Sequence, residues 1–172
     1  MERILVVGAT GAGKSTLARA LGGRLGLAYR EMDALHYIGP GWATNDRLTE
    51  DVSGLTSGSH WVFDSLGTPE VRDLLWRRAD TVIWLDYPRR IVMARVLRRS
   101  LRRTVTREAL FGGNRETWRG WLRRDHPAWW AWSQHASRRR EIGRRSRDTR
   151  FAPLDTLRFA HPDETAAWLA SL

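Results

Sequence analysis

The chain lacks cysteine and contains no long apolar run, and each of these absences excludes a class of protein. It also has only one lysine. Without cysteine it has no disulfide, no thiolate ligand for a metal and no thiol nucleophile. No apolar stretch approaches the 18 residues that a membrane-spanning helix requires. An apolar run begins within four residues of the start and leaves no room for a signal peptide, so we expect a cytoplasmic protein without a membrane partner.

Lys14 is the only lysine, against 28 arginines. An ammonium is a compact point charge, whereas a guanidinium is planar and broad. A sequence that uses arginine for every other positive side-chain charge therefore carries a small cation at this one position, which suits a charge placed between two phosphates.

Lys14 belongs to a glycine-rich stretch that directly follows the apolar run Ile4-Leu5-Val6-Val7. The stretch fits the phosphate-binding motif G-x-x-x-x-G-K-[ST] and consists of Gly8, Ala9, Thr10, Gly11, Ala12, Gly13, Lys14, Ser15 and Thr16. Its glycines let backbone N–H groups turn toward phosphate oxygens, and a helix beginning at Lys14 directs its positive end there. We expect Lys14 to reach the β and γ phosphates of ATP, and the Ser15 hydroxyl to bind Mg²⁺. The alternative is a glycine turn that only joins a strand to a helix.

Length and charge distribution point to one domain with an anionic partner. At 172 residues the chain suits a single domain, residues 1–172. Residues 87–150 hold 19 arginines and five acidic residues, whereas the rest of the chain is slightly acidic. The positive field thus belongs to one segment, and its partner is a nucleotide phosphate, a nucleic acid or an acidic membrane.

Strand-like and helical patterns alternate along the chain. Strands are expected at residues 4–7, 27–33, 61–64, 81–86 and 156–160. Helices are expected from Lys14, from Thr44 or Asn45 to about Leu55, from Pro69, from Pro88 and from Pro162, and residues 37–42 are expected to form a loop. This alternation predicts a three-layer α/β/α fold with a five-stranded parallel sheet, whose ligands bind at the carboxyl ends of the strands.

Asp33, Asp64 and Asp86 each end a predicted strand, on the same edge as the glycine-rich loop. Mg²⁺ takes one or two carboxylates besides phosphate oxygens, but spacing does not decide which of the three serves. Asp33 is placed to act as a base on an acceptor hydroxyl. The alternative is that it caps a helix or satisfies loop N–H groups. His36, a lone loop histidine, is expected to be a surface or packing residue.

The helix expected from Pro88 has two faces. One face is positive and consists of Arg95, Arg98, Arg99 and Arg102; the other is expected to pack on the sheet and consists of Ile91, Ala94, Leu97 and Leu101. Arginines at this spacing repel one another unless an anion lies against them. A transferring phosphoryl group is such an anion, and the alternative is a solvated basic face.

Residues 103–140 contain no readable strand, and we interpret them as a helical arginine-rich lid. Most of its tryptophans are expected to pack on the core, since several fall at helical spacing: Trp118, Trp121, Trp129 and Trp132. Arg138, Arg139 and Arg140 are candidate phosphate contacts at the end of the lid. Interleaved tryptophan and arginine would also suit nucleic-acid binding.

These motifs resemble the small P-loop kinases of the adenylate-kinase-like group, most closely those labelled DNA topology modulation protein. The resemblance spans nearly the whole chain and rests on residues 8–16, 33–36 with 41–42, 61–64, 79–88 and the arginine-rich helix. It implies that Asp64 is the Mg²⁺-associated residue, that Asp33 lies at the acceptor and that adenine lies near Ala160, His161 and Pro162. Asp86 belongs to the L-D-x-P signature. The group usually has Asp-Gly-Asn-Tyr at the third strand, and here Asp64-Ser65-Leu66-Gly67 removes polar groups from the expected acceptor pocket.

The sequence therefore predicts a monomeric phosphotransferase that uses ATP and Mg²⁺ to phosphorylate a nucleoside, a nucleotide or another hydroxylated metabolite. The expected catalytic residues are Lys14, Asp33, Arg98, Arg102 and Arg138. Two alternatives stay open: a nucleotide-regulated nucleic-acid-binding protein, and an ATPase with water as the acceptor.

Overall fold

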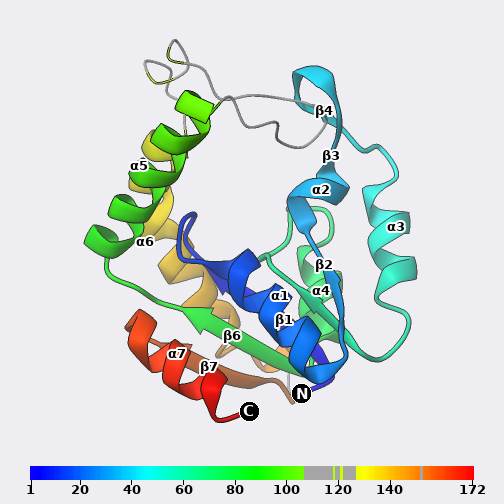
Figure 1. Cartoon of the computed structure of the whole chain (residues 1–172). Coiled ribbons are helices and arrows are strands. Elements are labelled where there is room, and N and C mark those ends of the chain that lie inside the picture. Colours follow the sequence, from blue (N-terminus) through cyan, green and yellow to red (C-terminus); the bar gives the residue numbers. More distant parts are fainter. Residues whose placement is uncertain (107–117, 119–120, 122–126, 152) are drawn as a thin grey trace.

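The computed structural model of the chain describes residues 1–106, 118, 121, 127–151 and 153–172. Its centre is a five-stranded sheet in the order β2-β5-β1-β6-β7, in which all neighbours are parallel. The strands are β1 (Arg3–Gly8), β2 (Ala28–Arg30), β5 (Trp61–Phe63), β6 (Thr81–Leu85) and β7 (Asp155–Phe159). β1 lies in the middle, so the glycine-rich loop leaves the centre of the sheet's carboxyl edge (Figure 1). The predicted three-layer fold is confirmed.

The apolar strands are buried on both faces of the sheet. Ile4 and Val6 of β1 belong to one core, which includes residues of α1 (Lys14–Leu25) and α5 (Arg89–Thr106). Leu5 and Val7 belong to the other, with α3 (Leu48–Leu55), α4 (Arg72–Arg78) and η4 (Thr149–Phe151). α7 (Pro162–Ala170) packs against β7, and α6 (Pro127–Arg145) contributes Ala131 to one core and Ile142 to the other. A continuous apolar run is what such doubly covered strands require.

A short segment outside the main sheet follows β2, and its structure differs from two predictions. It consists of α2 (Met32–His36), β3 (Tyr37–Gly39), η1 (Pro40–Trp42) and β4 (Ala43–Thr44), and β3 pairs antiparallel with β4. Residues 37–42 are therefore not only a loop, and Asp33 lies inside α2 rather than at a strand end. The strand stops early because the Met32 side chain is buried in the core while its N–H donates to the Asp64 carboxylate over 3.0 Å.

Two helices begin later than predicted. α4 begins at Arg72 and not at Pro69, because a turn precedes it in which the Val71 N–H donates to the Thr68 carbonyl over 3.2 Å. α3 begins at Leu48, and the Asn45 side chain accepts from the Arg47 N–H over 2.9 Å in the turn before it. The predicted strand 156–160 and the helix from Pro162 are present as β7 and α7.

The packed face of α5 differs from the predicted one. Its buried residues are Val92, Val96, Ser100 and Thr104. Of the predicted face, Ile91 packs against the core, whereas Ala94, Leu97 and Leu101 are exposed. Short side chains occupy this face because α5 packs closely against the glycine-rich loop. The approach is so close that a Cβ on Gly11 would lie 2.3 Å from Val96 Cγ2. Bulkier leucines on the same face would not allow that approach.

Part of the predicted lid, residues 107–117, 119–120 and 122–126, lies outside the described residues. Within the described part, the expectation that tryptophans pack on the core is wrong for four of them, which are exposed: Trp118, Trp129, Trp130 and Trp132. Trp129, Trp130 and Trp132 lie on α6, whose buried apolar side chains are those of the smaller residues Ala131 and Ile142. In the described ranges, no helix has both the length and the apolar composition needed to cross a bilayer.

Candidate nucleotide site

The glycine-rich loop is compact and depends on left-handed backbone conformations. Gly11 has φ +88° and Gly13 has φ +98°, values that L side chains rarely adopt. The Ala12 N–H donates to the Ala9 carbonyl over 3.1 Å, and the Lys14 ammonium donates to the same carbonyl over 3.2 Å. The loop therefore curls around its own lysine at the start of α1, as the phosphate-binding motif requires.

Arg95 of α5 binds the backbone of this loop through its guanidinium. Its guanidinium donates to the Ala12 carbonyl over 3.0 Å and lies over the Tyr87 ring at 5.5 Å from the centroid. A Cβ on Gly13 would lie 3.4 Å from Arg95 Nη1. Arg95 thus joins α5 to the loop backbone.

Several charged groups from distant parts of the chain converge on Lys14, which is half-buried. Burial lowers its pKa; the carboxylates of Asp33 and Asp64 act in the opposite direction, and Arg99 and Arg138 lower the pKa further. Of the predicted arginine face, Arg99 belongs to this group.

The structure does not bring Arg98 and Arg102 into the same group. Both are exposed on α5, and neither is among the charges that most affect the pKa of Lys14 or of Asp33. Each residue of a helix is rotated by about 100° from the last, so neighbours in sequence face different directions. Only the packing of α5 on the loop decides which arginine faces inward.

Ser15 and Asp64, the two predicted metal ligands, are both near a residue that sequence reasoning missed. Asp64 is buried; its Oδ1 accepts from the Met32 N–H and its Oδ2 from the Tyr29 hydroxyl, each over 3.0 Å. Burial together with Asp64 raises the pKa of Tyr29, and the nearby Ser15 side chain acts on the same hydroxyl in the opposite direction. Tyr29 lies on β2, which pairs with β5 just before Asp64, but no motif marks it.

These oxygen donors fit Mg²⁺, which prefers hydroxyl and carboxylate oxygens. Among the described residues, no three His, Asp or Glu side chains gather closely enough to form a metal cage. Ser15 and Asp64 are therefore partial ligands at most, and phosphate oxygens and water are the usual further ligands of this ion.

Asp33 faces the same region from α2. The residue as a whole is exposed to solvent, but its carboxyl group is surrounded by protein atoms. This burial of the carboxyl is the largest cause of its raised pKa, and the charge of Lys14 partly offsets the rise. An exposed residue with a partly buried carboxyl is what a side chain at the edge of an open site shows. A raised pKa is what a group that accepts a proton from an acceptor hydroxyl needs.

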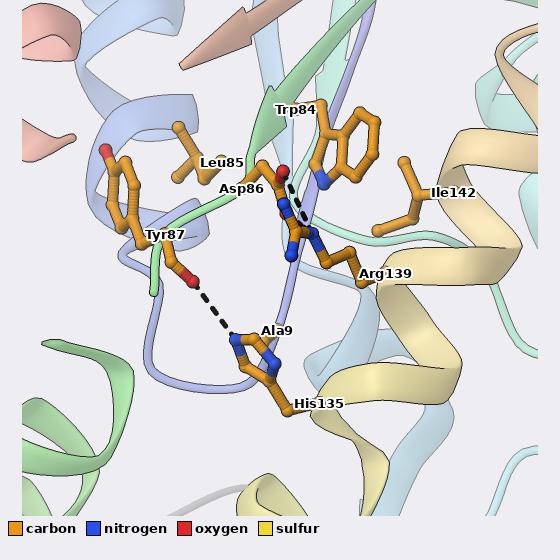
Figure 2. Close-up of a pocket in the computed structure, with 8 residues that line it drawn as sticks. All are labelled: Ala9, Trp84, Leu85, Asp86, Tyr87, His135, Arg139 and Ile142. Carbon is orange, nitrogen blue, oxygen red and sulfur yellow. Dashed lines mark hydrogen bonds and ion pairs between the residues drawn. The ribbon is translucent and has the colours of Figure 1, made fainter. Parts of the chain in front are cut away.

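Asp86, the third predicted strand-end carboxylate, is occupied by structural contacts. Its Oδ1 lies 2.9 Å from Arg139 Nε and its Oδ2 lies 2.5 Å from Arg158 Nη2 (Figure 2 shows the Arg139 pair). Nearby, the His135 ring nitrogen Nε2 is 3.0 Å from the Tyr87 carbonyl oxygen. Asp86 therefore holds α6 and β7 against the end of β6.

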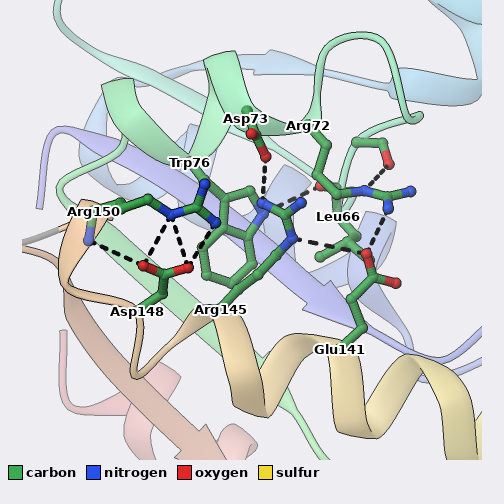
Figure 3. Close-up of polar contacts among 9 residues, drawn as sticks. Leu66, Arg72, Asp73, Trp76, Glu141, Arg145, Asp148 and Arg150 are labelled. Carbon is green, nitrogen blue, oxygen red and sulfur yellow. Dashed lines mark hydrogen bonds and ion pairs between the residues drawn. The ribbon is translucent and has the colours of Figure 1, made fainter.

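A second set of contacts fixes α6 to α4 (Figure 3). Arg72 Nη1 lies 2.5 Å from Glu141 Oε1, and Arg145 Nη1 lies 2.7 Å from Asp73 Oδ1. Arg72 also donates to the Gly67 carbonyl over 3.1 Å, in the loop that follows Asp64. These pairs and the Asp86 pair all follow Arg138 along α6, the His135 contact precedes it, and together they hold that part of the helix in place.

The three arginines predicted as phosphate contacts have different surroundings. Arg138 is half-buried and lies within the electrostatic range of Lys14, Asp33 and Arg72. Arg139 pairs with Asp86, and Arg140 is exposed. Of the three, Arg138 is the one that the structure brings to the candidate site.

His161, predicted near the adenine, caps α7. Its ring nitrogen Nδ1 accepts from the Asp163 N–H over 3.4 Å, and the Glu164 carboxylate accepts from the N–H groups of Ala160 and His161. Pro162 occupies the first position of the helix, where its missing N–H costs no hydrogen bond. The contacts of this turn are local, and a role in nucleotide binding stays a prediction.

No protein-family model and no curated protein sequence matches the chain. Solved structures do match it, among them shikimate kinase from Acinetobacter baumannii in complex with shikimate, at 17% identity, 99% coverage of this chain, 92% of that chain and a TM-score of 0.58. Deoxyadenosine kinase from M. mycoides with bound dCTP matches at 12% identity, 98% and 96% coverage and a TM-score of 0.51. A sugar kinase from a Janibacter species matches at 16% identity, 99% and 93% coverage and a TM-score of 0.50.

At these identities the matches show a shared fold. The chain has the three-layer arrangement of these kinases, over nearly its full length and theirs. A specific relation to the DNA topology modulation group is not shown by the comparisons.

Proposed function

We propose that the chain is a phosphotransferase that moves the γ-phosphoryl group of ATP to a hydroxyl of a small acceptor, with Mg²⁺ as cofactor. The observation that carries this proposal is the convergence of Lys14, Asp33, Asp64 and Arg138 on one compact glycine-rich loop. These residues come from four separate segments of the chain. Its fold likeness to three kinases supports the same reaction class.

Each converging group has a role in this reaction. The loop N–H groups and Lys14 bind the β and γ phosphates, and Ser15 and Asp64 hold Mg²⁺. Bound Mg²⁺ supplies neutralisation of phosphate charge. Asp33 accepts the proton of the acceptor hydroxyl as its oxygen forms a bond to Pγ, the bond from Pγ to the bridging oxygen breaks, and ADP leaves.

The arginines neutralise charge around the transferring group. Arg99 lies nearest this role on α5, while Arg98 and Arg102 are exposed and would need to turn inward to take part. We place the adenine near His161 and Pro162, beyond the carboxyl end of β7. Arg95, Arg99 and Arg138 act at the loop, and this local positive charge supports phosphotransfer over the nucleic-acid-binding alternative.

The test measures ADP release from ATP and Mg²⁺ in the presence of single nucleosides, nucleotides and hydroxylated metabolites. We expect one class of acceptor to stimulate release, and Lys14→Ala to abolish that release without lowering the unfolding temperature. Arg140→Ala, a change of an exposed arginine, is the control. Unchanged turnover in Lys14→Ala would overturn the proposal, and release that no acceptor stimulates would favour an ATPase.

A further inference from the structure

Four large apolar side chains are exposed on α5 and α6, the two helices that pack side by side at the edge of the molecule (Figure 1). Leu97 and Leu101 of α5 are 43% and 48% exposed, and Trp129 and Trp132 of α6 are 56% and 52% exposed. Single exposed apolar residues need no explanation, but a group of them on adjoining helices marks a surface that another molecule covers.

The four side chains belong to one face. The guanidinium of Arg89, at the start of α5, lies over the Trp132 ring at 4.7 Å from its centroid. Leu97 and Leu101 follow Arg89 by eight and twelve residues, about two and three turns along α5, and Trp129 lies one turn before Trp132 on α6. The leucines and the tryptophans therefore lie along the boundary between the two helices, on its solvent side.

This face of α5 points away from the nucleotide site. Arg95 donates to the Ala12 carbonyl over 3.0 Å, so its side of the helix faces the glycine-rich loop. Leu97 comes two residues later and is rotated by about 200° around the helix axis. A partner on the outer face would therefore leave the glycine-rich loop accessible.

The same two helices carry a large excess of positive charge. α5 has seven arginines and no acidic residue, and α6 has five arginines and one acidic residue, Glu141. Glu141 is already paired with Arg72 of α4, at 2.5 Å. Arg90 and Arg98 of α5 and Arg140 of α6 are exposed. The charge of this face therefore favours an anionic partner.

An anionic membrane surface matches both properties of the face. Its headgroup phosphates attract arginines, and its interfacial layer accepts tryptophan rings and aliphatic side chains. A nucleic acid would offer phosphates to the arginines and bases to the tryptophans, but no apolar layer to Leu97 and Leu101. A second copy of the chain would bring the same positive charge to the contact.

We propose that the outer face of α5 and α6 binds the surface of an anionic phospholipid bilayer. The two tryptophans and two leucines enter the interfacial layer, and the exposed arginines pair with the headgroups. The sequence expectation of no membrane partner concerned spanning segments, which surface association does not require. This binding does not depend on phosphotransfer, since the nucleotide site lies on the other side of α5.

The test is co-sedimentation of the full chain with vesicles of phosphatidylcholine alone or mixed equally with phosphatidylserine. We expect binding to the mixed vesicles only, and we expect added salt to weaken it because salt screens the attraction to the headgroups. Lipids brominated in their acyl chains should quench the fluorescence of the bound protein, because bromine quenches tryptophans that enter the apolar layer.

Variants assign the binding to this face. Trp132→Ala and Leu101→Gln should each weaken it by about 10-fold, since each removes an apolar side chain from the interface. Arg90→Gln should weaken it by about fivefold. Trp42→Ala in η1 and Arg47→Gln before α3 change exposed residues of the same types outside this face, and both variants should bind like wild type.

The proposal is overturned if the mixed vesicles do not bind the wild-type chain, or if Trp132→Ala and Leu101→Gln both leave the binding unchanged. Tighter binding of a single-stranded oligonucleotide than of vesicles, lost in Trp132→Ala and Arg90→Gln but kept in Leu101→Gln, would assign the face to a nucleic acid instead. Lys14→Ala should bind vesicles like wild type, so failure of the proposed phosphotransfer and failure of membrane binding give different results.

Discussion

Arg139 of α6 and Asp86 at the end of β6 form an ion pair with 2.9 Å between Nε and Oδ1, which joins α6 to the carboxyl edge of the sheet. The Asp86 side chain is almost fully buried, and Arg158 of β7 reaches its other oxygen. One carboxylate therefore joins three elements that carry or support the site.

Replacing Asp86 by Asn should lower the free energy of unfolding by about 1–2 kcal/mol. Loss of one partner of a buried pair usually costs more, but both arginines are about half exposed and keep much of their hydration. Urea denaturation followed by tryptophan fluorescence measures the change. A double-mutant cycle with Arg139→Gln should give a coupling energy, whereas Arg140→Gln in place of Arg139→Gln should give none.

Gly11→Ala should destabilise the protein by about 2 kcal/mol and weaken nucleotide binding. Alanine at this position would have to adopt φ +88°, which L residues rarely do, and its Cβ would lie 2.3 Å from Val96 Cγ2. Gly23→Ala is the matched control, since no atom lies within 4 Å of its Cβ position on α1, and it should be neutral or stabilising by up to about 1 kcal/mol. Equal effects of the two changes would contradict the close approach of α5.

Tyr29→Phe should weaken Mg²⁺ binding to the ADP complex by about 10-fold, because the hydroxyl that donates to Asp64 Oδ2 and orients this carboxylate is lost. Titration of Mg²⁺ into protein and ADP measures this, and ADP binding in excess EDTA should not change. Tyr87→Phe is the control, since its hydroxyl is 2.6 Å from Thr165 Oγ1 on α7. Wild-type Mg²⁺ affinity in Tyr29→Phe would show that Tyr29 does not position the metal ligands.

The raised pKa of Asp33 predicts opposite pH effects on activity and stability. A carboxyl whose folded pKa lies above its unfolded value favours folding below the unfolded value, and this contribution is lost as pH rises through the folded pKa. Asp33→Asn should therefore stabilise the protein at pH 8, and its advantage over wild type should shrink toward pH 4. Urea denaturation across this range tests the sign; a constant difference would contradict it.

In activity assays, the same group should make turnover of wild type decrease on acidification from a pH above the ordinary Asp value of 3.8. The charged form is the one that accepts a proton from the acceptor hydroxyl. The rate profile against pH at saturating ATP measures this limb. A limb that persists at the same pH in a slow Asp33→Asn enzyme would assign it to another group.

Local sequence patterns predict the sheet and the nucleotide loop well. The apolar runs of β1 and β6, the alternation of strands with helices and the glycine spacing of residues 8–16 each depend on neighbours in the chain. The strand predicted to end at Asp33 is the exception. Met32 is buried and its N–H donates to Asp64, 32 residues further along the chain, and residues 32–36 form a helix instead.

Sequence alone determined that this chain builds a parallel sheet with a glycine-rich loop at its centre, since backbone conformation and burial period are encoded within a few residues. Only the tertiary structure decided that Asp86 is a structural residue, that the Tyr29 hydroxyl donates to Asp64, and that Arg98 and Arg102 are exposed on α5. The reason is physical: the direction of a side chain on a helix, and the partner it meets, depend on how that helix packs against segments far away in sequence.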